Sequence, residues 1–123
     1  MKVFVYGTLK RGYGNNRACL DGARFIGEAT SASPFGMRAA GFPVIWPDRF
    51  GHPVRGEVFE IGDEHRQACD QLEGHPNFYR RMRRRFVLDG GKKITAWVYI
   101  FQGPRNGGFA VAPNASGQLE WSR

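Results

Sequence analysis

A glutamate at the end of a predicted helix is one of two features of this sequence that could do chemistry. Glu73 is followed by Gly74, a residue type that suits the left-handed position after a helix. Burial of the carboxylate and the negative end of the helix dipole would both raise its pKa. A carboxyl group with a raised pKa can accept a proton and return it near neutral pH. Glu73 is therefore a candidate general acid and base.

The residues alone leave a second interpretation of Glu73 open, in which it lies on a solvated helix end and pairs with Arg80 or Arg81. Helical spacing places Glu73 in a row with Cys69, next to the apolar pair Ala68 and Leu72. This predicts that Glu73 lies at the edge of the buried face.

The second feature is the segment VFVYGTLKRG at residues 3–12, an apolar strand that runs directly into a glycine turn. Where strand pairing ends, the backbone N–H groups of Gly7, Thr8 and Leu9 are free to bind an anionic group, and glycine allows close approach. A phosphate-binding loop is excluded, because Gly12 is followed by Tyr-Gly rather than by Lys and Ser or Thr.

Strands and one clear helix must position these two features. Apolar runs bounded by Gly, Pro or Asp predict seven strands, at residues 2–6, 24–32, 35–38, 44–46, 54–60, 79–88 and 94–101. Residues 64–73 are predicted to form a helix with Asp63 as the N-cap. Many strands with few helices favour a closed or nearly closed sheet, which removes exposed edges.

Length and composition predict one domain with its own core. The chain has 123 residues, 41% of them hydrophobic, with 17 Gly and 7 Pro. We place the domain at residues 1–102 and expect an irregular C-terminal tail at residues 103–123. A formal net charge of +7 favours acidic partners, either small anions or a nucleic-acid backbone.

The cysteines and histidines show no pattern of a metal site. Cys19 and Cys69 are interpreted as reduced thiols of a cytoplasmic protein, and His52, His65 and His75 are scattered. No apolar run approaches the length of a membrane span, so no membrane association is expected.

Four blocks of the sequence together resemble one protein family, the γ-glutamylcyclotransferase-like proteins, which include γ-glutamylamine cyclotransferases and AIG2-like proteins. The blocks are VYGTLKRG at 5–12 with Asn15, GFPVI at 41–45, VRGEVF at 54–59, and DQLEG at 70–74 with Tyr79 and Arg81. Their order and spacing match over residues 3–101, although Cys19 and Leu20 depart from the usual pattern.

The resemblance implies an α+β fold, a small mixed β-barrel of about six to seven strands with one or two short flanking helices. It implies that Glu73 is the catalytic acid and base and that the backbone of Tyr6, Gly7, Thr8 and Leu9 holds a glutamyl head group. Tyr6, Tyr79 and Tyr99 are candidate pocket residues, for which core packing is an equal alternative. The implied substrate is a small γ-glutamyl amine or γ-glutamyl amino acid.

The implied reaction is a cyclisation, in which the substrate's α-amine attacks its own γ-carbonyl and releases 5-oxoproline and an amine. No metal ion or cofactor is implied. Because the nucleophile is tethered, positioning supplies much of the rate acceleration. Glu73 would move the ammonium proton to the leaving amine, and the loop would hold the α-carboxylate or the carbonyl oxygen.

Two alternatives remain open. A catalytically silent relative would keep the pocket as a small-molecule binding module. A basic nucleic-acid-binding module would use the six residues 80–85, RRMRRR, whose alternate side chains point to one face if the segment is a strand. For that arginine row, a solvated strand face is the commoner explanation.

Overall fold

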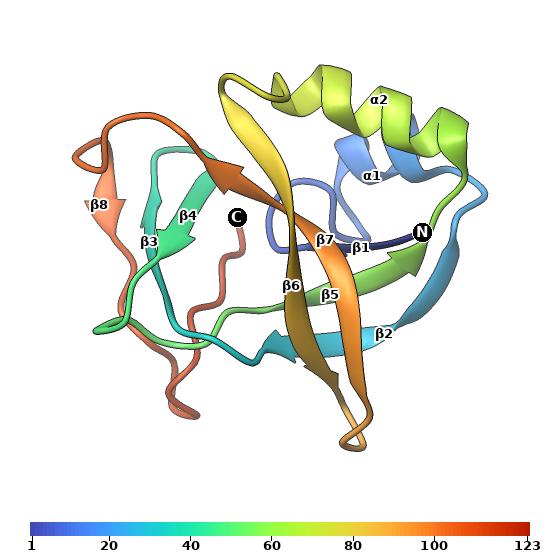
Figure 1. Cartoon of the computed structure of the whole chain (residues 1–123). Coiled ribbons are helices and arrows are strands. Elements are labelled where there is room, and N and C mark those ends of the chain that lie inside the picture. Colours follow the sequence, from blue (N-terminus) through green and yellow to red (C-terminus); the bar gives the residue numbers. More distant parts are fainter.

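Short apolar segments, separated by turns rich in glycine and proline, form eight strands in the computed structural model, which describes residues 1–123 (Figure 1). The strands are β1 (Lys2–Val5), β2 (Arg24–Ser31), β3 (Phe35–Ala39), β4 (Pro43–Pro47), β5 (Arg55–Glu60), β6 (Tyr79–Leu88), β7 (Lys93–Phe101) and β8 (Phe109–Ala110). All seven predicted strands are present, within one residue at each end.

Five strands close into a barrel in the order β1, β5, β2, β6, β7. All neighbours are antiparallel except β7 and β1, whose parallel pairing of Val3 with Trp97 and Phe4 with Val98 closes the barrel. The mixed, closed barrel is thus confirmed, with five strands rather than six or seven. Strands β3 and β4 instead join β8 in a separate sheet of order β4, β3, β8. Pro43 and Pro47 suit β4 to an edge, because proline cannot donate a ladder hydrogen bond.

Two helices lie side by side over one end of the barrel (Figure 1). The predicted helix is α2 (Asp63–Glu73), and Gly74 ends it with φ of 64°. Its N-cap is Gly62 rather than the expected Asp63, because the Gly62 N–H donates to His65 Nδ1 at 3.0 Å. The short helix α1 (Gly14–Leu20) lacks an acidic first turn and a side-chain cap, the signals that would have placed it in the sequence. Neither helix has the length and apolar character needed to cross a bilayer.

Side chains of β1 and of Tyr6, the residue that follows it, alternate between two buried clusters. Phe4 and Tyr6 point into the barrel, where Phe4 stacks on Phe86 with ring centroids 4.1 Å apart. Val3 and Val5 point the other way, into a second cluster beneath the helices. Strand β1 therefore packs against both clusters. The loop that follows it begins between the barrel core and the helices.

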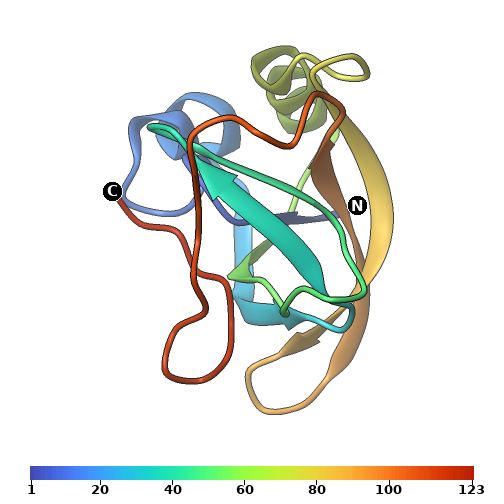
Figure 2. The same cartoon turned by 90° about the vertical axis from the view of Figure 1, so that its left-hand side faces the viewer.

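Residues 103–123 pack against the rest of the chain. Strand β8 pairs with β3, and the side chains of Leu119 and Trp121 are buried in the same core cluster as Phe4, a cluster that also contains residues of β3 and β4. Figure 2 shows this segment in red, running along one side of the molecule and ending beside the blue segment that leads into α1. The division at residue 102 stays a prediction, but the segment described as an irregular tail contributes to the core.

Candidate active site

A cavity of about 330 Å³ opens at the end of β1, between the turn before β4 and the last turn of α2. All seven residues predicted as site residues line it: Tyr6, Gly7, Thr8, Leu9, Glu73, Tyr79 and Tyr99. The two features that the sequence placed 65 or so residues apart therefore meet at one cavity.

The wall of the cavity next to β1 is the glycine loop, residues 6–9. The Lys10 N–H donates to the Gly7 carbonyl at 3.1 Å and closes the turn, but the N–H groups of Gly7, Thr8 and Leu9 donate to no acceptor in the protein. Only glycine fits at position 7, because a Cβ atom there would lie 2.8 Å from Pro43 Cγ. Three consecutive residues that line the cavity thus have unpaired backbone N–H groups.

Side chains from α1 and β5 fix the glycine loop in place. Asn15 Nδ2 donates to Thr8 Oγ1 at 2.9 Å, and Asn16 Nδ2 donates to the Leu9 carbonyl at 2.7 Å. Just after the loop, the Arg11 N–H donates to Glu57 Oε1 at 2.8 Å. Sequence reasoning assigned Glu57 no role, and its place in a Gly-Glu strand was the only signal.

Glu73 faces the glycine loop from the last residue of α2. Its carboxylate is mostly buried and makes no hydrogen bond and no ion pair. Burial raises its pKa from the usual 4.5 to about 7. The alternative that Glu73 pairs with Arg80 or Arg81 is wrong, because the Arg81 guanidinium binds another carboxylate on the same helix.

That carboxylate is Asp70, one helical turn before Glu73. Arg81 Nε donates to Asp70 Oδ1 at 2.9 Å, Arg66 Nη1 donates to Asp70 Oδ2 at 3.0 Å, and Tyr99 Oη donates to Asp70 Oδ1 at 2.6 Å. Burial by itself would raise the pKa of Asp70, but the hydrogen bonds from Arg81 and Tyr99 outweigh it and hold the pKa below its usual value. This cluster fixes the end of α2 on β6 and β7.

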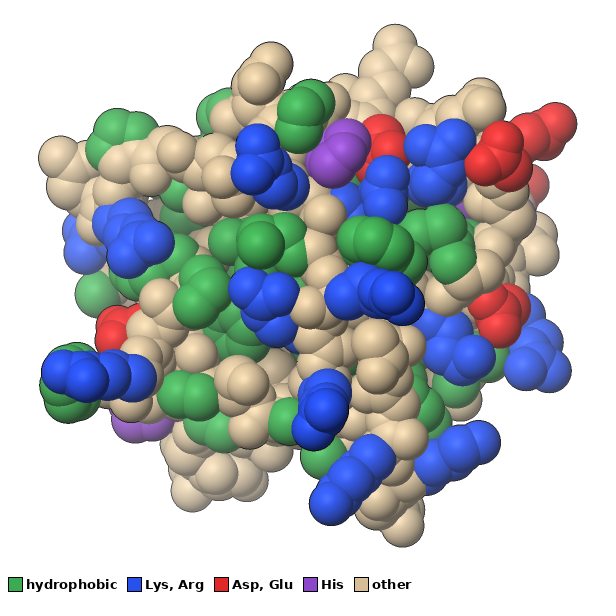
Figure 3. Space-filling model, in the orientation of Figure 1, with side chains coloured by type: hydrophobic (Ala, Val, Ile, Leu, Met, Phe, Trp, Pro, Cys, Tyr) green, Lys and Arg blue, Asp and Glu red, His purple; other side chains and the backbone are tan.

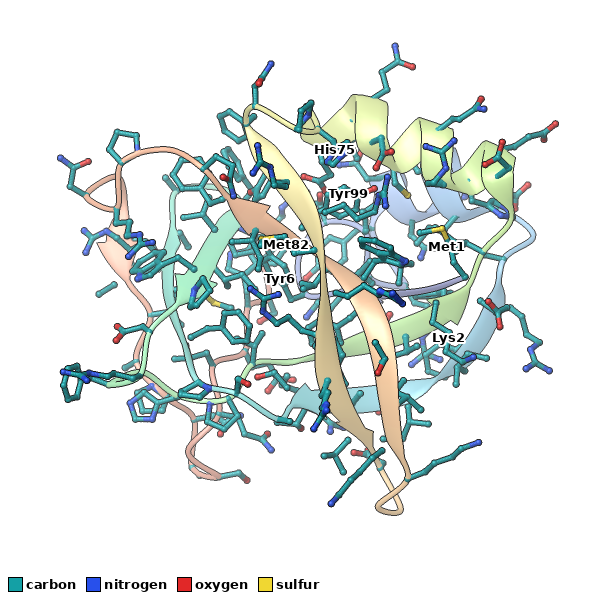
Figure 4. The ribbon with its side chains drawn as sticks, viewed as in Figure 1. Met1, Lys2, Tyr6, His75, Met82 and Tyr99 are labelled. Carbon is teal, nitrogen blue, oxygen red and sulfur yellow. The ribbon has the colours of Figure 1, made fainter.

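The three predicted tyrosines form the cavity wall, and each commits its hydroxyl proton elsewhere. Tyr6 Oη donates to the Tyr99 carbonyl at 2.6 Å, Tyr79 Oη donates to the Pro43 carbonyl at 2.8 Å, and Tyr99 Oη donates to Asp70. Figure 4 shows Tyr99 beneath α2 and Tyr6 further toward the barrel. Burial raises the pKa of all three, so they are neutral phenols that shape the cavity.

Three exposed apolar side chains surround the opening of the cavity, and we call them the apolar mouth: Phe42, Leu72 and Phe78. They come from the turn before β4, from α2 and from the turn before β6. The sequence showed the Gly-Phe-Pro block at residues 41–43 but not the exposure of its phenylalanine. Arg123, from the C-terminal segment, also lines the cavity.

The arginine-rich segment lies outside the cavity, on β6. Arg81 and Arg83 lie over the Trp97 ring, at 4.8 and 5.4 Å from its centroid, and Arg81 also binds Asp70. Figure 3 shows Lys and Arg side chains spread over the face that carries β6 and β7, with apolar surface between them. Nucleic-acid binding by this strand stays a prediction.

Comparison with known proteins identifies the family. The family model described as "Gamma-glutamyl cyclotransferase, AIG2-like" matches residues 3–122. The chain belongs to this family. The family predicted from the four sequence blocks is therefore confirmed, and the match extends through the C-terminal segment.

Members of the γ-glutamyl cyclotransferase, AIG2-like family from mammals are similar in sequence and fold. The γ-glutamylaminecyclotransferase of Bos taurus is 40% identical over 107 residues, which cover 79% of this chain and 63% of the bovine protein. That of Mus musculus is 35% identical over 113 residues, covering 79% and 75%. The crystal structure of a mouse AIG2-like protein superposes with a TM-score of 0.74 at 26% identity, covering 99% of this chain and 95% of the mouse chain.

Proposed function

We propose that this chain is a γ-glutamyl cyclotransferase that converts a γ-glutamyl amine to 5-oxoproline and a free amine, with Glu73 as its acid and base. One observation carries the proposal. An unpaired carboxylate with a pKa of about 7 lines the same cavity as three consecutive residues whose backbone N–H groups are unpaired. Family membership and the names of the mammalian relatives support the same reaction.

The two sides of the cavity complement the glutamyl head group. Its α-carboxylate is an anion, which the N–H groups of Gly7, Thr8 and Leu9 bind. Its α-ammonium is a cation, which the Glu73 carboxylate binds in its ionised form. The head group thus lies between the glycine loop and the end of α2, and its γ-carbonyl comes within reach of its own α-nitrogen.

The proposed reaction forms one C–N bond and breaks another. The α-ammonium gives a proton to Glu73, and the free amine attacks the γ-carbonyl carbon to close a five-membered ring. The bond from that carbon to the leaving nitrogen then breaks. In all, two protons pass from the α-nitrogen to the leaving nitrogen, and Glu73 carries them one at a time as base and then as acid. A carboxyl pKa of about 7 suits both directions of transfer.

The remaining groups of the cavity position the substrate. Ring closure within one molecule has a high effective molarity, so a site that holds the head group in a folded conformation supplies much of the acceleration. The buried tyrosines have committed their hydroxyl protons to backbone or Asp70 and provide a rigid wall. The steps use only groups of the substrate and Glu73.

The test is to measure 5-oxoproline release from a panel of γ-glutamyl amines and γ-glutamyl amino acids with the wild type and with Glu73→Gln. Glutamine keeps the shape of the side chain but cannot carry the proton, so we expect kcat/KM to fall by at least about a hundredfold. Glu64→Gln is the matched control, because Glu64 lies on the same helix, is exposed and lies outside the cavity. It should keep wild-type activity.

Two results would contradict the proposal. If the wild type releases no 5-oxoproline from any member of the panel, the chain is a silent relative, and calorimetric binding of 5-oxoproline would then measure the pocket's remaining role. If Glu73→Gln keeps wild-type activity, the reaction has a different acid and base.

A further inference from the structure

The cavity changes in character from its inner end to its opening. At the inner end Tyr6, Tyr79 and Tyr99 are almost fully buried, and the unpaired donors and Glu73 provide polar contacts. At the opening, the apolar mouth exposes 42% of Phe42, 44% of Leu72 and 47% of Phe78. These are three of the seven large apolar side chains that the whole chain leaves exposed, and they gather at this one opening.

A second cavity continues the apolar surface beyond the mouth. Its volume is about 130 Å³, and it shares Phe42 and Phe78 with the first cavity. The two shared rings have centroids 6.3 Å apart and form the boundary between the cavities. Val44 and Phe101 also line the second cavity. An apolar path therefore leads outward from Glu73, across the two phenylalanines.

The charges along this path are unfavourable to a cation. Glu73 is the only acidic side chain that lines the first cavity, and no acidic side chain lines the second. The positively charged side chains that line the two cavities are Arg123 in the first and Arg38 in the second. A cationic leaving chain would lose hydration there without gaining a partner, whereas an apolar chain would bury its surface against the rings.

On the basis of the proposed function, we infer that the apolar mouth is the leaving-group site and that it selects amines with an uncharged, apolar chain over amines with a second positive charge. The head group occupies the inner end, because only that end has free donors and a carboxylate. The scissile bond lies beside Glu73, and the leaving amine extends over Phe42 and Phe78.

Two substrates of nearly equal length test this selection. One is γ-glutamyl-n-hexylamide, and the other is the γ-glutamyl amide of 1,5-diaminopentane, in which an ammonium group replaces the terminal methyl group. We expect the wild type to show a kcat/KM at least about tenfold higher for the hexylamide, the size of effect that an apolar pocket gives. Measurements at two salt concentrations separate contact with the mouth from long-range repulsion by the net charge.

Phe42→Glu tests whether the mouth sets the preference. Phe42 contacts only the Phe78 ring among the aromatic side chains, so a carboxylate there has room and supplies the missing anion. We expect the ratio of kcat/KM for the hexylamide to kcat/KM for the diaminopentane amide to fall by at least about tenfold. Phe50→Glu is the matched control, because this substitution makes the same change in charge. Phe50 is 80% exposed and lies outside both cavities. It should leave the ratio unchanged.

The outcomes are distinguishable. Equal turnover of both amides, or faster turnover of the diaminopentane amide, overturns the inference and leaves the cyclotransferase proposal standing. A preference for the hexylamide that Phe42→Glu does not alter also overturns it, because another surface then selects the amine. If neither amide nor any other γ-glutamyl compound yields 5-oxoproline, the proposed function itself fails.

Discussion

Two carboxylates of α2, only three residues apart, lie in opposite environments. Asp70 faces β6 and β7 and accepts hydrogen bonds from Arg81 and Tyr99 on these strands and from Arg66 on its own helix. Its pKa is held below the usual value. Glu73 faces the glycine loop, where it has no partner, and burial raises its pKa to about 7. The two side chains leave the helix in different directions around its axis. Asp70 therefore lies beside arginines, whereas Glu73 lies beside the cavity.

The difference shows how one helical turn can anchor itself and also present a reactive group. Asp70 supplies structural stability through charged hydrogen bonds, and these hold the last turn of α2 against the barrel. Glu73 then occupies a place that it would avoid if the helix were free to move, because a desolvated carboxylate without a partner is unfavourable. In this interpretation the hydrogen bonds of Asp70 hold the last turn of α2 in place, and this keeps Glu73 buried and its pKa raised.

The largest expected effect comes from removing the charge of Asp70. Asp70→Asn leaves the partly buried Arg81 guanidinium without its carboxylate, so we expect the free energy of unfolding at pH 7 to fall by about 3 kcal/mol. Because the folded-state pKa of Asp70 is lowered, its stabilisation is present above the usual pKa of 3.8 and is lost as the pH falls through the folded-state value. Urea unfolding of both proteins at pH 7 and at successively lower pH, down to pH 2, measures the stabilisation and its loss.

Asp63→Asn is the control for Asp70→Asn. Asp63 also binds Arg66, at 3.1 Å, but its side chain is 76% exposed. Exposed ion pairs contribute little, so the change should lower the free energy of unfolding far less than Asp70→Asn does. If the two variants are equally stable, Asp70 does not anchor the helix, and the contrast with Glu73 has no structural basis.

The next effect is the dependence of activity on pH. Glu73 must be ionised to accept the ammonium proton, and with a pKa of about 7 only about 1% of it is ionised at pH 5. We therefore expect kcat/KM to be about a hundredfold lower at pH 5 than on the plateau above pH 8. Circular dichroism across the same range checks that the protein stays folded. A midpoint near pH 4.5 would contradict the raised pKa, since it would indicate a solvated carboxylate.

Local patterns in the sequence predicted the strands and the helix end, but not which strands would pair. Proline and glycine bound the apolar runs, and Gly74 marked the end of α2. The division into a five-stranded barrel and a separate sheet depends on contacts between distant segments, such as β7 with β1. Helix α1 was missed because its first turn has no acidic residue and the side chain of its N-cap, Tyr13, makes no capping hydrogen bond.

The candidate site shows the same limit. The glycine loop and Glu73 could be proposed from residue type, helix position and family resemblance. Whether Arg81 would bind Asp70 or Glu73 depends on how α2 is rotated over β6, which no local pattern encodes. The apolar mouth was also missed, because three residues from separate segments become neighbours only in the folded chain.

A smaller effect is expected on the stability of Glu73→Gln. Because the folded-state pKa of Glu73 is raised, the folded protein binds this proton more tightly than the unfolded chain does. The stability that results is fully present below pH 4.5 and is lost as the pH rises through about 7. At pH 8.5 the wild type therefore holds an ionised, partly buried carboxylate. The neutral variant should be more stable by about 2 kcal/mol, which is less than the full pKa shift corresponds to because solvent screens the partly exposed charge. At pH 4.5 the two proteins should unfold alike. A variant less stable than wild type at pH 8.5 would mean that Glu73 is stabilised by its surroundings.

The smallest effect concerns the Tyr99 hydroxyl, which links the Asp70 cluster to the cavity wall. Tyr99→Phe removes one of the donors to Asp70 but leaves Arg66 and Arg81 in place, so we expect a loss of about 1 kcal/mol. Tyr79→Phe is the comparison, because its hydroxyl donates to the Pro43 carbonyl and does not reach Asp70. Only Tyr99→Phe should raise the pKa of Asp70, which NMR titration of the carboxyl carbon measures. If instead the midpoint of the kcat/KM profile shifts in Tyr99→Phe with the pKa of Asp70 unchanged, the hydroxyl acts on Glu73 directly, and the two carboxylates are not independent.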